Sequence, residues 1–510
     1  FLSSSISSSM QGAAFIIIFS PCFAYKNYNA FRLLTMKTQD KKEQAHAKKI
    51  EIVERVMDER EDKHEAKIGQ HFGYKGLLAY TFPTIITLLV ISTFSVIDGI
   101  FVSNFPGPYS GETSLAAINL AYPLILLFIT ISYVVGIGGN AIIAATLGEK
   151  KLKRARQIFS MLFVFTGACG IVFFILYILL DGPFLKLMGA TGTLYSLADS
   201  YGFIISFFIP IGVMQSVLSY MFISAGKPGM NIFVSLSGGI TNLILDFLFV
   251  FCFGWGVQGA ALATGLGYAV AGMISIVYFV RRNSSSLHLV KPIWDWRILK
   301  KTITNGFSEL VANFSESVIV MIFNFQLMLY IGENGVAAYS ALEYVGYVFI
   351  SVLYGFVEGA EPIVSYNYGA KNYKEQRGLF KKIVVIICVM SITMFLFAEI
   401  FGPQLVYAFV GYSPELFDYT VHSFRIYSIA FLFAGFAIFG SGYFTALNNG
   451  LISAVIAFAN FLVFEVGFIM IFPEVFGIES IWSAVPCAMF CTTLLTVVLL
   501  FVFRKRYRYF

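Results

Sequence analysis

The chain has 510 residues, of which 58% are hydrophobic and only 13% are charged. A soluble protein of this length carries about 25% charged residues, so the composition excludes an ordinary soluble domain. The net charge of +6 comes from basic residues that are not patterned for nucleic acid, and the six cysteines form neither a disulfide framework nor a zinc pattern.

Residues 1–75 precede the first long apolar run and are expected to form a cytoplasmic extension. The stretch AFIIIFSPCFAY (14–25) is too short to span a bilayer, and no basic segment precedes it as in a signal peptide. Met36 opens MKTQDKKEQ, an ordinary cytoplasmic beginning, so we expect residues 1–35 to be an over-extended gene start. Residues 37–68 have mixed charge and predict a solvated helix without a functional signal.

Apolar runs of about twenty residues recur along the rest of the chain, and each can cross a bilayer as a helix. They predict an all-α polytopic membrane protein with twelve spans: 78–103, 114–146, 158–180, 200–224, 229–253, 257–280, 303–330, 335–366, 380–400, 422–446, 450–472 and 480–503. We divide the chain into the extension 1–75, a six-helix half 76–280, a cytoplasmic linker 281–302, a second six-helix half 303–503 and a basic cytoplasmic tail 504–510.

Basic residues set the orientation. If the N-terminus is cytoplasmic, the inner loops and the tail hold twenty-one of the 35 lysines and arginines, whereas the outer loops hold only Lys186. Cytoplasmic loops of membrane proteins are enriched in Lys and Arg. The sequence therefore predicts that both termini lie in the cytoplasm, at the inner membrane if the source is bacterial.

The two halves share an internal repeat. Residues 115–159 align without a gap with 336–380, at an offset of 221, and both segments end in G-x-K-x-x-K-x-x-R. An even number of spans in each half gives both halves the same orientation, related by an axis along the membrane normal. Two similar bundles that face a central cavity predict a transporter working by alternating access.

Carboxylates inside apolar spans are candidates for function because they are costly in lipid. Asp98, Asp246 and Thr264 are predicted to lie at one level, about 8–11 Å below the outer surface at 1.5 Å per residue. Asn242 lies four residues before Asp246 and so on the same helix face. Such an all-oxygen set suits a hard cation, and two close carboxylates could instead hold a proton. The alternative is that Asn242 and Thr264 merely form hydrogen bonds between helices.

The second half does not repeat this set in sequence. Asn460 and Glu465 are five residues apart, which on an α-helix puts them on different faces, so the halves are expected to differ in function. The second half instead offers five candidate acids for a substrate cavity: Glu309, Glu316, Glu343, Glu358 and Glu361. Carboxylates with aromatic residues would attract lipophilic cations. Pro83 lies fifteen residues before Asp98, where a bend could move the acid.

Several segments resemble the MATE family, the multidrug and toxic compound extrusion transporters, most closely its DinF-like, MepA-like prokaryotic branch. They are FSVIDGIFVSN (94–104), AGKPGMN (225–231), GVQGAALAT (256–264) and PIVSYNYGAKN (362–372). The resemblance covers about residues 76–505 and implies an antiporter that exchanges Na⁺ or H⁺ for a drug-like, often cationic compound. It also implies a cation site at Asp98, Asn242, Asp246 and Thr264, which would hold Na⁺ as a metal if the coupling ion is sodium, and a bending role for Pro83. The second-half ion site of another branch is incomplete here, because Glu316 matches but span 10 has no acid.

The leading hypothesis is therefore a cation-coupled multidrug antiporter. A lipid or lipid-linked oligosaccharide flippase is the first alternative, although flippase cavities carry basic residues and these spans carry acids. A membrane enzyme or a receptor is the second, and the repeat argues against both. The chain has no nucleotide-binding or catalytic motif, so we expect a monomer in the lipid bilayer without an ATPase partner, an enzymatic activity or a cofactor.

Overall fold

The computed structural model describes residues 68–105, 107–109, 111–281, 283–411 and 413–510. The predicted start at Met36 and most of the predicted N-terminal extension lie outside the described residues. The described residues belong to one compact unit, His64–Phe510.

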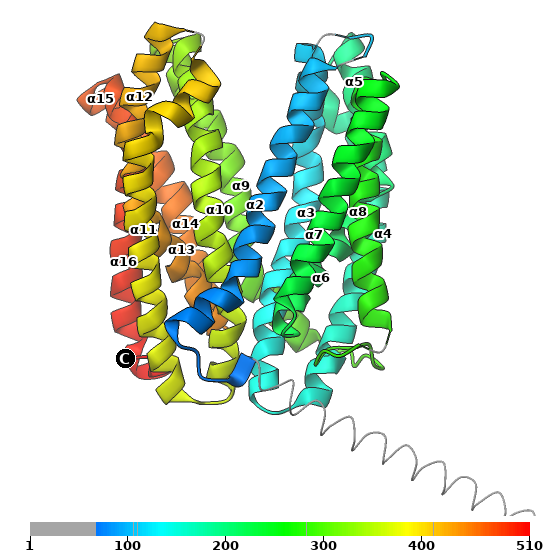
Figure 1. Cartoon of the computed structure of the whole chain (residues 1–510), viewed down its shortest axis with the longest axis vertical. Helices are drawn as coiled ribbons and strands as arrows, with labels where there is room; N and C mark the ends of the chain where they lie inside the picture. Colours follow the sequence, from blue (N-terminus) through cyan, green and yellow to red (C-terminus); the bar gives the residue numbers. More distant parts are fainter. Residues whose placement is uncertain (1–67, 106, 110, 282, 412) are drawn as a thin grey trace, which may run out of the picture. The chain divides into compact units, whose positions relative to one another are not determined.

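Long helices connected by short loops make up the first half of this unit (Figure 1). They are α2 (Tyr74–Asn104), α3 (Gly111–Gly148), α4 (Leu152–Leu187), α5 (Gly192–Ser206), α6 (Ile209–Ser224), α7 (Pro228–Asp246), the π-helix η1 (Phe247–Cys252) and α8 (Gly256–Val280). An irregular segment then leads to the second half.

The second half repeats this order. Its elements are α9 (Trp296–Tyr330), α10 (Glu333–Gly369), α11 (Tyr373–Val410), α12 (Pro414–Ser428), α13 (Phe431–Ala446), α14 (Gly450–Phe458), the π-helix η2 (Ala459–Glu465), α15 (Val466–Phe476), the 3₁₀ helix η3 (Ile478–Ser483) and α16 (Ala484–Tyr507). Counting each sharply bent helix pair as one span, the described residues hold twelve candidate membrane spans, as the sequence predicts.

Two of the predicted single spans are broken. α5 and α6 meet at 58°, and α12 and α13 meet at 46°. At the first break Pro210 is the second residue of α6, where its missing N–H costs nothing, so it starts a helix rather than bending one. The linker is also shorter than predicted, because Asp295 caps α9 by accepting hydrogen bonds from the backbone N–H groups of Arg297 and Ile298.

Each half has its own hydrophobic core, but the halves exchange the beginnings of their first helices. Leu77 and Ile85 of α2 belong to a cluster made mainly of second-half residues, including Phe356 and Ile387. Leu299 of α9 belongs to a cluster made of first-half residues. α2 and α9 occupy equivalent places in the repeat, and each therefore begins packed against the other half.

Glycines let these crossing helices touch backbone to backbone. A Cβ added to Gly138 would lie 2.1 Å from the carbonyl oxygen of Thr302, and one added to Gly359 would lie 3.0 Å from Thr81 Cα. The repeat offset of 221 relates the two contacts, because Gly138 corresponds to Gly359 and Thr81 corresponds to Thr302. Since only glycine permits this approach, the repeat specifies the contact between the halves.

A second repeat-related pair closes the contact at the end of the molecule that carries the basic loops, which we call the basic end. A Cβ on Gly148 would lie 1.9 Å from the carbonyl oxygen of Tyr366, and a Cβ on Gly369 would lie 1.9 Å from that of Ala145. We call these two contacts between α3 and α10, made by Gly148 and Gly369, the glycine seam. Away from it, the helices of the two halves spread apart toward the opposite end (Figure 1).

The shared motif G-x-K-x-x-K-x-x-R has a structural role at the same end. Its lysines Lys150 and Lys371 both take a left-handed backbone conformation, with φ of 59° and 54°. Its arginines then hold the chain that leaves each half: Arg156 Nε donates to Ser286 O at 3.0 Å, and Arg377 Nε donates to Arg508 O at 3.1 Å. The motif thus fixes the segments that follow α8 and α16.

Candidate functional site

A cavity of about 370 Å³ lies between the two halves. Its wall comes from α2, α3, α6 and α7 of the first half and from α9, α10, α12, α13, α14, η2 and α16 of the second. The second half supplies most of the lining residues. A site that both halves build changes shape whenever the halves move relative to each other.

The lining has one sign of charge. All five acids predicted for a substrate cavity line it, and Glu465 is a sixth. Six tyrosines accompany them, namely Tyr133, Tyr220, Tyr339, Tyr347, Tyr354 and Tyr427. Among the described residues that line the cavity there is no Lys or Arg. Such a wall suits a cation with an apolar body, because carboxylates attract its charge and aromatic faces bind it through cation–π contacts.

The glutamates form two groups at different depths. Glu309, Glu358 and Glu361 interact through their charges and lie nearer the basic end, where α9 begins and α10 ends. We call them the near group. Glu316, Glu343 and Glu465 interact in the same way, farther from that end, and form the far group.

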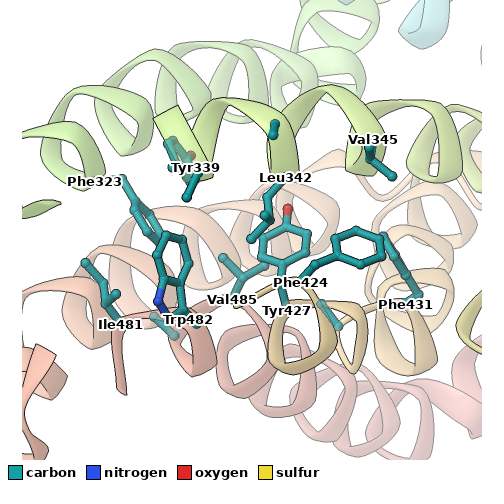
Figure 2. Packing of buried hydrophobic residues seen from close by; sticks show 14 of the residues in the cluster. Phe323, Tyr339, Leu342, Val345, Phe424, Tyr427, Phe431, Ile481, Trp482 and Val485 are labelled. Carbon is teal, nitrogen blue, oxygen red and sulfur yellow. The ribbon is translucent and has the colours of Figure 1, made fainter. Parts of the chain in front are cut away.

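Close packing fixes the far group. The ring of Tyr339 stacks on Phe323, with centroids 4.1 Å apart and planes within 4°, and its hydroxyl donates to Glu343 Oε1 at 3.1 Å. Figure 2 shows Tyr339 and Tyr427 among the apolar side chains that hold them, including Trp482 and Phe431. The tyrosines therefore have a rigid apolar base and hold fixed positions in the cavity wall.

The prediction that Asn460 and Glu465 lie on different faces is wrong. Both side chains are buried and both line the cavity. The reason is that Ala459–Glu465 is a π-helix, whose wider turn brings residues five apart close to one face. The neighbouring α16 supports this arrangement, since Thr492 Oγ1 donates to Asn460 Oδ1 at 2.7 Å.

The four residues predicted to bind a cation converge in the first half. The carboxyl groups of Asp98 and Asp246 lie close enough to interact with each other and with the Asn242 side chain. Asn242 Nδ2 donates to Thr264 Oγ1 at 3.4 Å, a long contact that joins α7 to α8. It is the hydrogen bond between helices that the sequence offered as the alternative role of these two residues. We call Asp98, Asn242, Asp246 and Thr264 the aspartate site.

The aspartate site holds unsatisfied oxygens. Asp246 is fully buried, and neither of its carboxylate oxygens has a hydrogen-bond partner of good geometry within the described residues; the same holds for Asp98 Oδ1. The interactions among the three side chains are therefore looser than true hydrogen bonds. Buried carboxylate oxygens without donors are costly unless a proton or a cation joins them. Two carboxylates, an amide and a hydroxyl fit either one.

The aspartate site is separate from the cavity, because none of its four residues lines the cavity. One helix connects the two. α2 carries Asp98 and also lines the cavity with five residues, Thr84, Thr87, Leu88, Ile91 and Ser92. It runs unbroken through Pro83, which lies one residue before the first of these. The bending role predicted for Pro83 stays a prediction.

The fold and this site define the class of protein: a polytopic membrane transporter with two repeat-related halves around a central cavity. The MatE family model matches residues 83–248 and 310–471, which cover more than half of the chain. The chain therefore belongs to the MatE family, whose members are transporters and not enzymes.

Curated relatives and solved structures agree with this assignment. The multidrug export protein MepA of Staphylococcus saprophyticus is 25% identical over 71% of this chain and 80% of its own length. MepA of Staphylococcus aureus N315 is 23% identical over 85% of this chain and 94% of its own.

Among solved structures, a MATE crystal structure in complex with MaL6 has a TM-score of 0.82 at 21% identity, covering 88% of this chain and 99% of that one. A MOP superfamily transporter from Pyrococcus furiosus has a TM-score of 0.80 at 21% identity, with 88% and 99% coverage. At this identity the structures show the shared fold alone.

Proposed function

We propose that the protein is a multidrug efflux antiporter, which exports lipophilic cations in exchange for Na⁺ or H⁺ by alternating access. The observation that carries the proposal is the cavity, lined by six glutamates and six tyrosines without a basic residue in the described lining. Its relatives bear the name multidrug export protein. A flippase for phosphate-bearing lipids fits poorly, because the same wall would repel phosphates.

The conformation supports alternating access. The glycine seam joins the halves at the basic end, and positive loops favour the cytoplasmic side. With that end in the cytoplasm, the structure represents a state closed to the cytoplasm. Transport requires a second state in which the seam opens, and the tight backbone contacts along it favour two discrete arrangements over a continuous bend.

The aspartate site would hold the coupling ion. Asp98 and Asp246 would supply the charge, and the Asn242 and Thr264 oxygens would complete the set for Na⁺; for H⁺ the two carboxyl groups would share the proton. Because α2 carries Asp98 and also lines the cavity, binding at the aspartate site can change the shape of the substrate site. A coupling ion needs this kind of link, since it acts only by binding the two states with different affinity.

The substitution Asp246→Asn tests this assignment. We expect it to abolish ion-driven ethidium efflux from cells while the protein still inserts in the membrane, because the amide can neither take up a proton nor supply the charge that holds Na⁺. Asp199→Asn, on α5 and outside both sites, is the matched control and should keep wild-type efflux. Wild-type efflux by Asp246→Asn would exclude the aspartate site as the coupling site.

A further inference from the structure

The near group and the far group each contain a buried carboxylate that nothing in the described protein satisfies. Glu361 of the near group is 4% exposed, and its Oε1 has no hydrogen-bond partner there. Glu465 of the far group is 6% exposed, and its Oε2 likewise has none. Both residues line the cavity. A buried acceptor without a donor is costly, so each group has an unmet need for a positive partner.

The two groups are electrostatically distinct. Within the described residues, the charge interactions pair each glutamate only with members of its own group. Glu309 and Glu316 are seven residues apart on α9, or about 10 Å along its axis, and Glu343 and Glu358 are about 22 Å apart along α10 at 1.5 Å per residue.

Aromatic surface lies between the groups. Tyr347 and Tyr354 line the cavity. Both lie on α10 between Glu343 of the far group and Glu358 of the near group. The cavity thus has two acidic ends and an aromatic middle.

Each acidic end can offer only a limited charge. Full ionisation of three neighbouring carboxyl groups is disfavoured where the described lining holds no basic residue, because like charges at close range repel each other. A group of three that shares protons in this way matches one positive charge better than several. Two such groups, about 10 Å or more apart along the helices that carry them, match two separate positive charges.

We infer that the cavity is a two-ended receptor for elongated dications, which place one cationic group among Glu309, Glu358 and Glu361, the other among Glu316, Glu343 and Glu465, and their apolar spacer on the tyrosines between. The inference rests on the proposed function and makes it more specific: the site selects for two charges at a defined separation. A compact monocation occupies one end and leaves the other without a positive partner.

A matched pair of ligands tests the inference. Decamethonium carries two trimethylammonium groups on a ten-carbon chain, and decyltrimethylammonium carries one on the same chain. Calorimetry with the purified full-length protein should show decamethonium binding at least about tenfold more tightly. Hexamethonium, with a shorter spacer, should keep less of this preference, because its two charges lie closer together than those of decamethonium.

Charge removal at either end should abolish the preference. Glu361→Gln and Glu465→Gln should each bring the ratio of the two affinities close to one, while the monocation still binds at the intact end. Glu343→Gln provides a second far-group variant if Glu465→Gln does not fold. Glu399→Gln is the matched control: Glu399 lies on α11, accepts a hydrogen bond from Ser428 and does not line the cavity, so the ratio should stay that of the wild type.

Equal affinity for the two ligands in the wild type, or a preference that survives loss of charge at both ends, would overturn the inference. Ethidium transport by the same purified protein in proteoliposomes separates the two proposals. If efflux is ion-driven but dications are not preferred, the proposed function stands and the two-ended site is wrong. If dications are preferred but no gradient drives efflux, the proposed function is wrong.

Discussion

At the residue scale, the two halves use the same device with different acids. In the first half an asparagine on α7 contacts a threonine on α8, and an aspartate ends α7. In the second half Asn460 on η2 contacts Thr492 on α16, and Glu465 ends η2. The halves therefore differ in where the acid points: Asp246 joins Asp98 away from the cavity, whereas Glu465 lines the cavity.

The hydrogen bond from Thr492 to Asn460 should contribute measurably to stability. Thr492→Val keeps the side-chain shape but leaves the buried Asn460 Oδ1 without its donor, which costs about 1–3 kcal/mol. We expect a lower midpoint of thermal unfolding in detergent, and recovery in Thr492→Ser, which restores the hydroxyl. An unchanged midpoint in Thr492→Val would show that the bond contributes nothing.

At the element scale, the glycine seam depends on the absence of two side chains. Gly369→Ala places a methyl group 1.9 Å from the carbonyl oxygen of Ala145, and backbone must move to relieve the clash. We expect the seam to separate, so that a cysteine introduced at Ala145 becomes more reactive toward a water-soluble maleimide. Gly467→Ala is the control, because a Cβ there meets no atom within 4 Å and an alanine suits the helix interior. Equal labelling in both variants would contradict this role for the seam.

The elements themselves follow largely from the sequence. Hydropathy predicts the number of spans, and the gapless repeat predicts both halves. The break between α12 and α13 was not predictable, because apolar composition continues across it and no helix-breaking residue lies there. At the break between α5 and α6, Pro210 was a signal in the sequence. The π-helices were missed for a related reason: a residue pattern read at 3.6 per turn assigns Glu465 to the wrong face. An asparagine followed four or five residues later by an acid occurs in both halves, at Asn242 and Asp246 and at Asn460 and Glu465, and this recurrence was the signal that could have revealed it.

At the scale of the whole molecule, the segment before α2 ties the first half to the second. Phe72 is almost fully buried among second-half residues, and Glu375 of α11 accepts from its backbone N–H at 3.2 Å and contacts His71 Nδ1 at 2.6 Å. Lys382 donates to the Phe72 carbonyl oxygen. The contact spans the basic end, so it stabilises the state that is closed there.

Loss of the Phe72 ring should weaken this state. Phe72→Ala removes a buried aromatic side chain, a change that typically costs about 3–5 kcal/mol, and we expect a clear fall in the midpoint of thermal unfolding. His71→Ala should change it little, because the histidine is largely exposed and exposed ion pairs contribute little. If the two variants unfold at the same temperature as the wild type, the segment does not hold the halves together.

In the proposed function, an ion gradient drives the export of cations through the acidic cavity. The most direct measurement is ethidium transport in proteoliposomes that contain the purified protein, with a Na⁺ gradient and a pH gradient imposed separately. We predict that at least one gradient drives ethidium against its own concentration gradient, and that Asp246→Asn removes this transport while ethidium still binds. Ethidium that only equilibrates under both gradients, at the same rate in wild type and variant, would contradict ion-coupled export.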